Sequence, residues 1–453
     1  MSSLAKNRQM TLAAWRKLNP GATGSDIKEF KLAFGKVENT GLPDGVQALV
    51  PKPEDISILD PGTLNYQDAQ MITTTQPSWL DADGQLTNKD GTECYISGAM
   101  KRKIVAAGLI PPVPVPSKTI YRISSSPNKG LCMFAKTDIP AGELIVAERP
   151  LVIFPGRIMT ERRDEIPEHL TFQQMQQVML NDAEILYTRV VDRLDPQRKA
   201  AFMKLANSHL HDGSGPIVGR VRTNGFGRLT DPGSIGEYTI IGDNLSRMNH
   251  SCSPNVHCDF DMHTFSLTAR AVREIKKGEE ITVHYCHILE PAETRQESLA
   301  PYGFKCECKA CLDPRSSDLV RAKCAAYTSR ANSEGLWYFD ESIPKAPSFA
   351  SLLAALRVFT EEGLEVCDAY GYVLYQLLKA YLATNDFENV KIYLDKYRAW
   401  AQATGNEETA TKKVIHAWNL GRMVLQLRVL GLAVVLAAKR MPKKTGAAKK
   451  TAK

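Results

Sequence analysis

The sequence lacks any apolar run long enough to cross a membrane. Its most apolar stretch, residues 429–438, is ten residues long, whereas a membrane-spanning helix needs about twenty apolar residues. The first twenty residues also lack the apolar core of a secretory signal peptide. These two absences favour an intracellular protein, in the nucleus or the cytoplasm, that has no attachment to a membrane.

Acidic residues are absent from the last fifteen positions, residues 439–453. This segment holds seven Lys and Arg residues, so its charge equals the formal net charge of +7 of the whole chain. The rest of the chain is therefore neutral on balance. We expect a solvated, disordered basic tail. The alternative role for the tail is contact with nucleic acid, which would be weak, salt-sensitive and independent of base sequence.

Cysteine is scarce, with ten residues in 453 and none between positions 156 and 225. In a reducing compartment these cysteines are expected to be free thiols or metal ligands. Three of them, Cys306, Cys308 and Cys311, lie together in "CECKAC". Disulfide geometry is hard to satisfy between such close neighbours, whereas the spacing suits thiolates that converge on a tetrahedral zinc ion. A closed structural site needs a fourth ligand from elsewhere in the chain.

The texture of the sequence changes several times along its length, which predicts two to three domains. Residues 1–116 are rich in Pro, Gly, Thr and Asp, show little periodicity and end in the linker-like "IPPVPVPS". Short β-prone runs with turn residues follow at 119–154 and return at 239–286. Helical spacing dominates residues 158–212. A helical insert therefore interrupts a β domain.

The C-terminal part of the chain is predicted to be helical. Residues 368–404 have the pattern of two amphipathic helices joined by a short polar turn at Asn385 and Asp386. Such a pair resembles one unit of a helical-repeat array, although no second copy recurs at a fixed period.

Four stretches carry a resemblance to a known family. In order they are "NKGLCMFAKTDIPAGELI", "RMNHSCSPN", "GEEITVHY" and "YGFKCECKAC". Together they resemble a SET domain followed by a cysteine-rich post-SET segment. The arrangement is similar to that of the SET- and MYND-domain family and its fungal relatives, over about residues 119–312. A MYND zinc finger needs a dense run of Cys and His inside the insert, so we expect that this module is absent.

The resemblance implies an α+β fold. We expect a SET-domain β-fold of short sheets with a helical insert, followed by an all-α, repeat-like C-terminal domain. The expected boundaries are a poorly ordered N-terminal region at 1–116, the first SET half at 117–155, the insert at 156–225, the second SET half at 226–300, the post-SET zinc segment at 301–314, the helical domain at 315–438 and the basic tail at 439–453.

The resemblance also implies a function, because SET proteins of this type are lysine methyltransferases that use S-adenosylmethionine. One departure is Asn128, which stands where the family usually has a glycine; Asn tolerates unusual backbone angles better than most residues. The implied roles are cofactor binding by Lys129, Gly130, Cys132, Asn224, Asn249, His250, Tyr285 and Phe304, catalysis by Tyr285, a substrate channel at Tyr302, and zinc binding by Cys252, Cys306, Cys308 and Cys311.

The chemistry of methyl transfer to lysine explains why such a site needs a tyrosine that orients the amine and does not need a strong general base. A lysine amine has a pKa of about 10.4, so making it neutral at pH 7 costs about 4.6 kcal/mol. A nearby sulfonium and a dry channel both lower that pKa. The protein must then hold the amine, methyl group and sulfur in line. Alternation through Ile281 and Val283 predicts that Tyr285 sits on a rigid strand, where its hydroxyl can orient the amine.

The leading hypothesis is thus a protein lysine methyltransferase, for which a histone is one candidate substrate. One alternative is a methyltransferase that acts on a non-histone protein. The other is a SET-like scaffold that binds partners through its C-terminal helices and has weak or no activity. In each case we expect a monomer, and for the enzyme the partner is a protein lysine.

Overall fold

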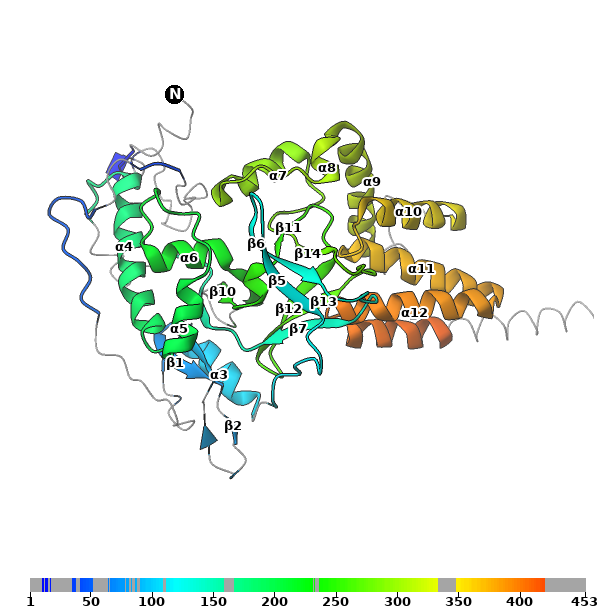
Figure 1. The fold of residues 1–453 in the computed structure, drawn as a ribbon, viewed down its shortest axis with the longest axis horizontal. Helices are drawn as coiled ribbons and strands as arrows, with labels where there is room; N and C mark the ends of the chain where they lie inside the picture. The colour runs from blue at the N-terminus through cyan, green and yellow to red at the C-terminus, as the bar shows by residue number, and fades with distance from the viewer. Residues whose placement is uncertain are drawn as a thin grey trace, which may run out of the picture. The chain divides into compact units, whose positions relative to one another are not determined.

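The structure is a computed structural model (Figure 1), and the chain divides into two units, residues 1–321 and 322–453, which are described separately. No helix in the described parts of the chain is both long and apolar enough to cross a membrane. The predicted basic tail lies outside the described residues. The structure describes residues 10–11, 13–14, 17, 35–37, 41–51, 64, 66–77, 79–80, 83, 86–87, 90–108, 111–158, 167–230, 232, 236–332 and 348–419.

The largest sheet of the first unit has five strands in the order β1–β4–β8–β10–β9. The pairing of β4 with β8 is parallel, and the other pairs are antiparallel. The strands are β1 (Met71–Gln76), β4 (Thr92–Ser97), β8 (Val152–Pro155), β9 (Phe226–Thr230) and β10 (Glu237–Ile241). Two short strands, β2 (Trp79–Leu80) and β3 (Leu86–Thr87), form a separate pair.

The expectation of a poorly ordered region at 1–116 is wrong for residues 71–76 and 92–106. Strands β1 and β4 belong to the five-stranded sheet, and helix α3 (Gly98–Ala106) follows β4 directly, capped by the Ser97 side chain. Both strands are buried along nearly their whole length. A strand that is buried on both faces does not show the alternation of apolar and polar residues on which the sequence prediction relied.

Two smaller sheets carry the rest of the β domain. The four-stranded sheet has the order β11–β14–β6–β5, and the three-stranded sheet has the order β12–β13–β7. In the first of them β11 and β14 are parallel, although they come from different parts of the chain. The strands are β5 (Tyr121–Ser126), β6 (Gly130–Ala135), β7 (Leu144–Glu148), β11 (Asn249–His250), β12 (Val256–Asp261), β13 (Ser266–Ala271) and β14 (Glu280–Val283).

The helical insert contains α4 (Phe172–Val191), α5 (Pro196–Met203) and α6 (Pro216–Asn224). Helix α4 begins with a capping box in which the side chains of Thr171 and Gln174 satisfy each other's backbone N–H groups. Its buried face packs against β4 and β8, so that the insert and the N-terminal strands share one core. Figure 1 shows the three helices grouped beside the sheets.

The 3₁₀ turn η3 (Leu245–Arg247) lies between β10 and β11. The β domain is followed by α7 (Ala292–Leu299), the 3₁₀ turn η4 (Ala300–Tyr302), the short helix α8 (Lys309–Leu312) and the longer helix α9 (Pro314–Asn332).

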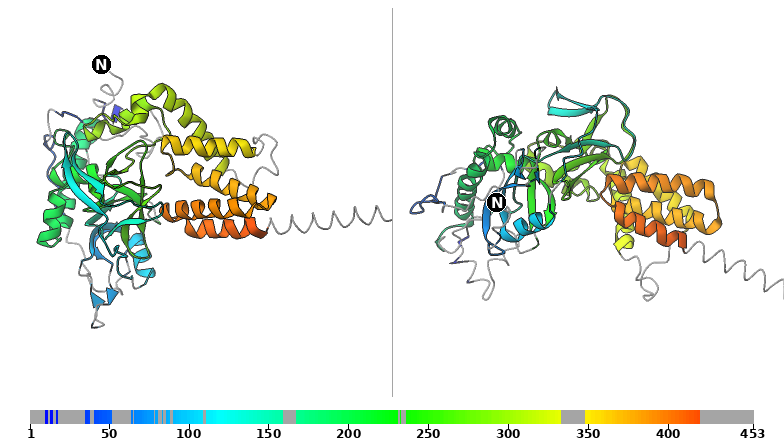
Figure 2. Two further views of the ribbon diagram at one scale, coloured as in Figure 1. Left: turned by 45° about the vertical axis from the view of Figure 1, so that its right-hand side comes forward. Right: turned by 90° about the horizontal axis from the view of Figure 1, so that it is seen from below.

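The second unit is helical throughout its described residues. It contains α10 (Phe349–Glu362), α11 (Asp368–Thr384) and α12 (Phe387–Ala403), and α11 packs against both of the others (Figure 2). The predicted turn between α11 and α12 is confirmed, because Asn385 adopts the left-handed conformation and Asp386 caps α12. The α+β fold class with a helical C-terminal region is thus also confirmed.

Candidate active site

The hairpin of β5 and β6 forms the first predicted cofactor loop. At its turn Asn128 has a φ angle of 62° and Gly130 has one of 69°. Asn128 therefore adopts the left-handed backbone conformation that favours glycine, and the turn is kept without a glycine at this position. The next residue, Lys129, forms a 2.8 Å ion pair with the carboxylate of Glu280 on β14.

Asn249 on β11 joins the second predicted cofactor segment to the first loop. Its side-chain Nδ2 donates to Glu280 Oε1 at 3.1 Å and to the carbonyl oxygen of Leu131 at 3.3 Å. The same Nδ2 lies 3.0 Å from the sulfur of Cys132. Three segments that are far apart in the sequence thus meet around one amide.

Glu280 is the acid at the centre of this arrangement, and sequence reasoning gave it no role. Burial disfavours its charged form, but hydrogen bonds from Lys129 and Asn249 outweigh that effect and hold the pKa of Glu280 below its usual value. The carboxylate is therefore ionised at neutral pH. Glu280 lies in the stretch "GEEITVHY", five residues before Tyr285, and this position is the only feature of the sequence that points to the site.

Four aromatic side chains form a cluster next to this junction. The ring centroids of His250 and Tyr285 are 5.5 Å apart, those of Tyr285 and Tyr302 are 4.8 Å apart, and those of His250 and Phe304 are 6.2 Å apart. Phe304 remains 40% exposed. The cluster thus brings the predicted cofactor and channel residues together.

Tyr285 lies beyond the strand, not on it as predicted, because β14 ends at Val283. Its backbone N–H donates to the ring Nδ1 of His250 at 3.0 Å instead of to a neighbouring strand. Its hydroxyl donates to the carbonyl oxygen of Met248 at 2.6 Å. Burial raises the pKa of Tyr285 well above its usual value, so the phenol stays protonated at neutral pH.

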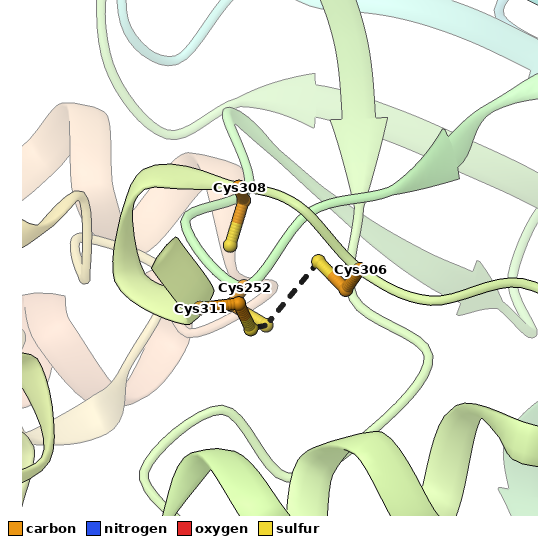
Figure 3. A group of neighbouring side chains, drawn as sticks. All are labelled: Cys252, Cys306, Cys308 and Cys311. Atoms are coloured by element: carbon orange, nitrogen blue, oxygen red, sulfur yellow. Dashed lines mark hydrogen bonds between the residues drawn. The ribbon is translucent and has the colours of Figure 1, made fainter. Parts of the chain in front are cut away.

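The four predicted metal ligands converge on one point (Figure 3). The sulfur atoms of Cys252, Cys306, Cys308 and Cys311 all lie within 4.8 Å of one another. The sulfur of Cys252 is 3.9 Å from that of Cys306 and 3.6 Å from that of Cys311. Four thiols at such separations suit a tetrahedral zinc ion of the structural type.

A fifth thiol, Cys286, lies beside the cluster and was missed from the sequence. Its sulfur, that of Cys252 and a ring nitrogen of His250 are also within 4.8 Å of one another. The Nε2 of His250 is 3.3 Å from the Cys252 sulfur. His250 thus contacts both the aromatic cluster and the thiol cluster, so the two are continuous.

Two arginines next to the thiols are the largest fully buried side chains in the described part of the chain. Arg295 on α7 lies 3.7 Å from the sulfur of Cys311 and also pairs with Asp318. Arg321 on α9 donates to the carbonyl oxygen of Cys252 at 2.9 Å. Both were missed, since a single arginine on a helix forms no motif.

Asn224 is placed differently from the other predicted cofactor residues. It ends α6, and its Nδ2 donates to the carbonyl oxygens of Ala206 and Arg220 at 2.8 Å each. The side-chain N–H groups of Asn224 therefore have hydrogen-bond partners within the helical insert.

Comparison with known proteins identifies a known domain within this chain. Residues 130–286 match the family model described as the SET domain. The chain contains a SET domain. This match confirms the SET-domain part of the resemblance, which the first three sequence stretches carry; the fourth stretch, at 302–311, lies outside the matched residues.

Curated relatives agree with this assignment over parts of their length. The SET-domain chain is 34% identical over 214 residues to "Histone-lysine N-methyltransferase set5" of Schizosaccharomyces pombe, covering 46% of this chain and 57% of that protein. It is 33% identical over 133 residues to "N-lysine methyltransferase SMYD2" of Homo sapiens, covering 27% of this chain and 30% of that protein. Mouse "Histone-lysine N-methyltransferase SMYD3" is 43% identical over 68 residues, 15% of each chain. The chain thus spans little more than half of the first relative.

Proposed function

We propose that this protein is an S-adenosylmethionine-dependent protein lysine N-methyltransferase. The observation that carries the proposal is the link between Tyr285 and His250, where a backbone hydrogen bond joins the predicted catalytic tyrosine to the predicted cofactor segment. The relatives named above, which are described as lysine methyltransferases, support it.

The residues around this link fit the cofactor. We assign its binding to Lys129, Gly130 and Cys132 in the first loop and to Asn249 and His250 on β11. When bound, S-adenosylmethionine supplies a methyl group on a cationic sulfur. The exposed ring of Phe304 offers a face on which an adenine can stack. The amide of Asn224 has two partners within its own segment, so we give it no direct contact.

Tyr285 orients the reactants and takes no proton. Its raised pKa keeps the hydroxyl protonated, so it cannot act as a base at neutral pH. We propose that the hydroxyl and nearby carbonyl oxygens, such as that of Met248, hold the lysine amine and contact the polarised methyl group. The ring of Tyr302 packs against that of Tyr285 at a tilt and helps to exclude water from the channel.

The four converging thiols would hold a structural zinc ion. Cys252 follows β11 by two residues, whereas Cys306, Cys308 and Cys311 belong to the post-SET segment that also contains Phe304. A zinc ion there would fix this segment, and with it the aromatic ring, next to the cofactor residues. The role of the ion is therefore structural and not catalytic.

We propose that the substrate is a histone. We also propose that the protein is located in the nucleus or the cytoplasm and that it acts as a monomer. The test is incubation with methyl-labelled cofactor, histone octamers and a cell extract, with wild type beside Tyr285→Phe. Tyrosine-dependent label in histones supports the full proposal. Label only in other proteins indicates a non-histone methyltransferase, and absence of label with a folded protein indicates the scaffold alternative.

A further inference from the structure

Glu280 occupies a position that the proposed mechanism leaves unused. Its carboxylate accepts hydrogen bonds from Lys129 Nζ at 2.8 Å and from Asn249 Nδ2 at 3.1 Å. It comes from β14, whereas the two donors belong to the first loop and to β11. The Glu280 side chain thus links the first loop to β11, the two segments that are proposed to bind the cofactor.

The alternation of β14 explains this placement. Ile281 and Val283 point into the core, so Glu280 and Thr282 lie on the opposite face of the strand. The Glu280 side chain is 18% exposed, which leaves it accessible at the edge of the junction. Its negative charge also reaches the phenol of Tyr285, whose pKa is raised first by burial and further by Glu280.

We infer that Glu280 is a positioning residue of the cofactor site, which ties the first loop to Asn249 and presents a negative charge to the cationic end of the cofactor. This inference rests on the proposed function. S-adenosylmethionine carries a sulfonium charge that its product, S-adenosylhomocysteine, lacks. A carboxylate in a partly desolvated site attracts a cation more strongly than it would in water. Glu280 therefore favours the substrate form over the product form.

The test is binding calorimetry of Glu280→Gln with each of the two ligands. The amide keeps the size of the side chain but loses its charge and weakens the contacts to Lys129 and Asn249. We expect affinity for S-adenosylhomocysteine to fall about ten-fold, as for loss of a hydrogen bond to a charged group. Affinity for S-adenosylmethionine should fall about five-fold further, because it carries the additional positive charge.

The neighbouring residue provides a matched control. Glu279 has the same charge, but its carboxylate accepts from Asn255 Nδ2 at 3.1 Å and from the backbone N–H of Lys276 at 3.0 Å, away from the cofactor residues. Glu279→Gln should leave both affinities within about two-fold of wild type. Glu280→Asp, which keeps the charge, should retain the preference for S-adenosylmethionine even where its overall affinity is lower.

Unchanged affinities in Glu280→Gln, or equal losses for both ligands, overturn the inference. If that variant does not fold, Lys129→Met tests the same charge, because it removes the cation that is paired with Glu280. Removing the cation that partly neutralises Glu280 should raise the ratio of S-adenosylmethionine to S-adenosylhomocysteine affinity, and an unchanged ratio overturns the inference. A wild-type protein that binds neither ligand contradicts the proposed function itself.

Discussion

The phenol of Tyr285 donates a 2.6 Å hydrogen bond to the carbonyl oxygen of Met248, the residue immediately before Asn249. The backbone N–H of the same tyrosine is bound to the ring of His250. Tyr285 is therefore held at two points by the segment that is proposed to bind the cofactor. The position of Tyr285 therefore depends on this segment. The segment does not depend on Tyr285 alone, because Asn249 also contacts Leu131 and Glu280.

Replacing Tyr285 by Phe should therefore separate catalysis from binding. The ring and its packing against Tyr302 stay, but the hydroxyl that orients the amine is lost. We expect turnover to fall by about 10²-fold or more, the cost of removing one preorganised polar group from an active site. Single-turnover methylation assays measure this change. Calorimetry with S-adenosylhomocysteine should show affinity within about three-fold of wild type.

Tyr121→Phe is the matched control for this substitution, because Tyr121 lies on β5, in the same sheet as the strand β14 that precedes Tyr285, but outside the aromatic cluster. It should keep near wild-type turnover. Equal losses of turnover and of cofactor affinity in Tyr285→Phe would contradict an orienting role for the hydroxyl.

Removing a single thiol from the cluster should remove the metal. We expect one zinc per chain in the wild type and none in Cys308→Ser, measured by elemental analysis of the purified protein. Cys252→Ser should lower cofactor affinity together with zinc content, because Cys252 lies two residues beyond His250. Cys367→Ser, outside the cluster at the start of α11, should keep its zinc. A well-folded wild type without zinc would rule out the metal site.

Arg295 should control how tightly the zinc is held. A zinc ion with four thiolates has a net charge of −2, and a fully buried guanidinium beside Cys311 offsets part of it. We expect Arg295→Gln to lower zinc affinity by about 10- to 100-fold, as for other residues that support metal ligands. Competition with a chromogenic chelator measures this affinity. Arg315→Gln, on the exposed start of α9, is the control and should have no effect. Equal zinc affinity in Arg295→Gln and wild type would show that the buried charge serves the fold alone.

The sequence predicted best where the chemistry is local or the motif is dense. The spacing of Cys306, Cys308 and Cys311 was enough to indicate a metal site. The ordered stretches around Asn249 and Tyr285 were enough to indicate a SET domain. Residues that act through tertiary contacts were missed. Glu280, Arg295 and Cys286 match no recognisable motif in the sequence around them, and their roles follow only from contacts with residues far away in the chain.

The N-terminal strands show a second limit of sequence reasoning. The pattern of "MITTTQ" and "TECYIS" does not alternate, since both strands are buried by neighbours that come later in the chain: β1 packs against β4 and α3, and β4 packs against α4 and β8. The backbone N–H of Ser97, at the end of β4, donates to the hydroxyl of Tyr238 at 2.9 Å, a residue that lies 141 positions later in the chain. These partners cannot be read from residues 71–97 alone.

If these strands are part of the core, a cavity in β4 should destabilise the first unit. Ile96 is fully buried among residues of both the N-terminal region and the SET domain. We expect Ile96→Ala to lower the free energy of unfolding by about 2–5 kcal/mol, through lost burial and the cavity left behind. Urea denaturation followed by circular dichroism measures the change. Val115→Ala in the exposed linker should stay within about 0.5 kcal/mol of wild type. An Ile96→Ala protein as stable as that control would mean that β4 does not contribute to the core.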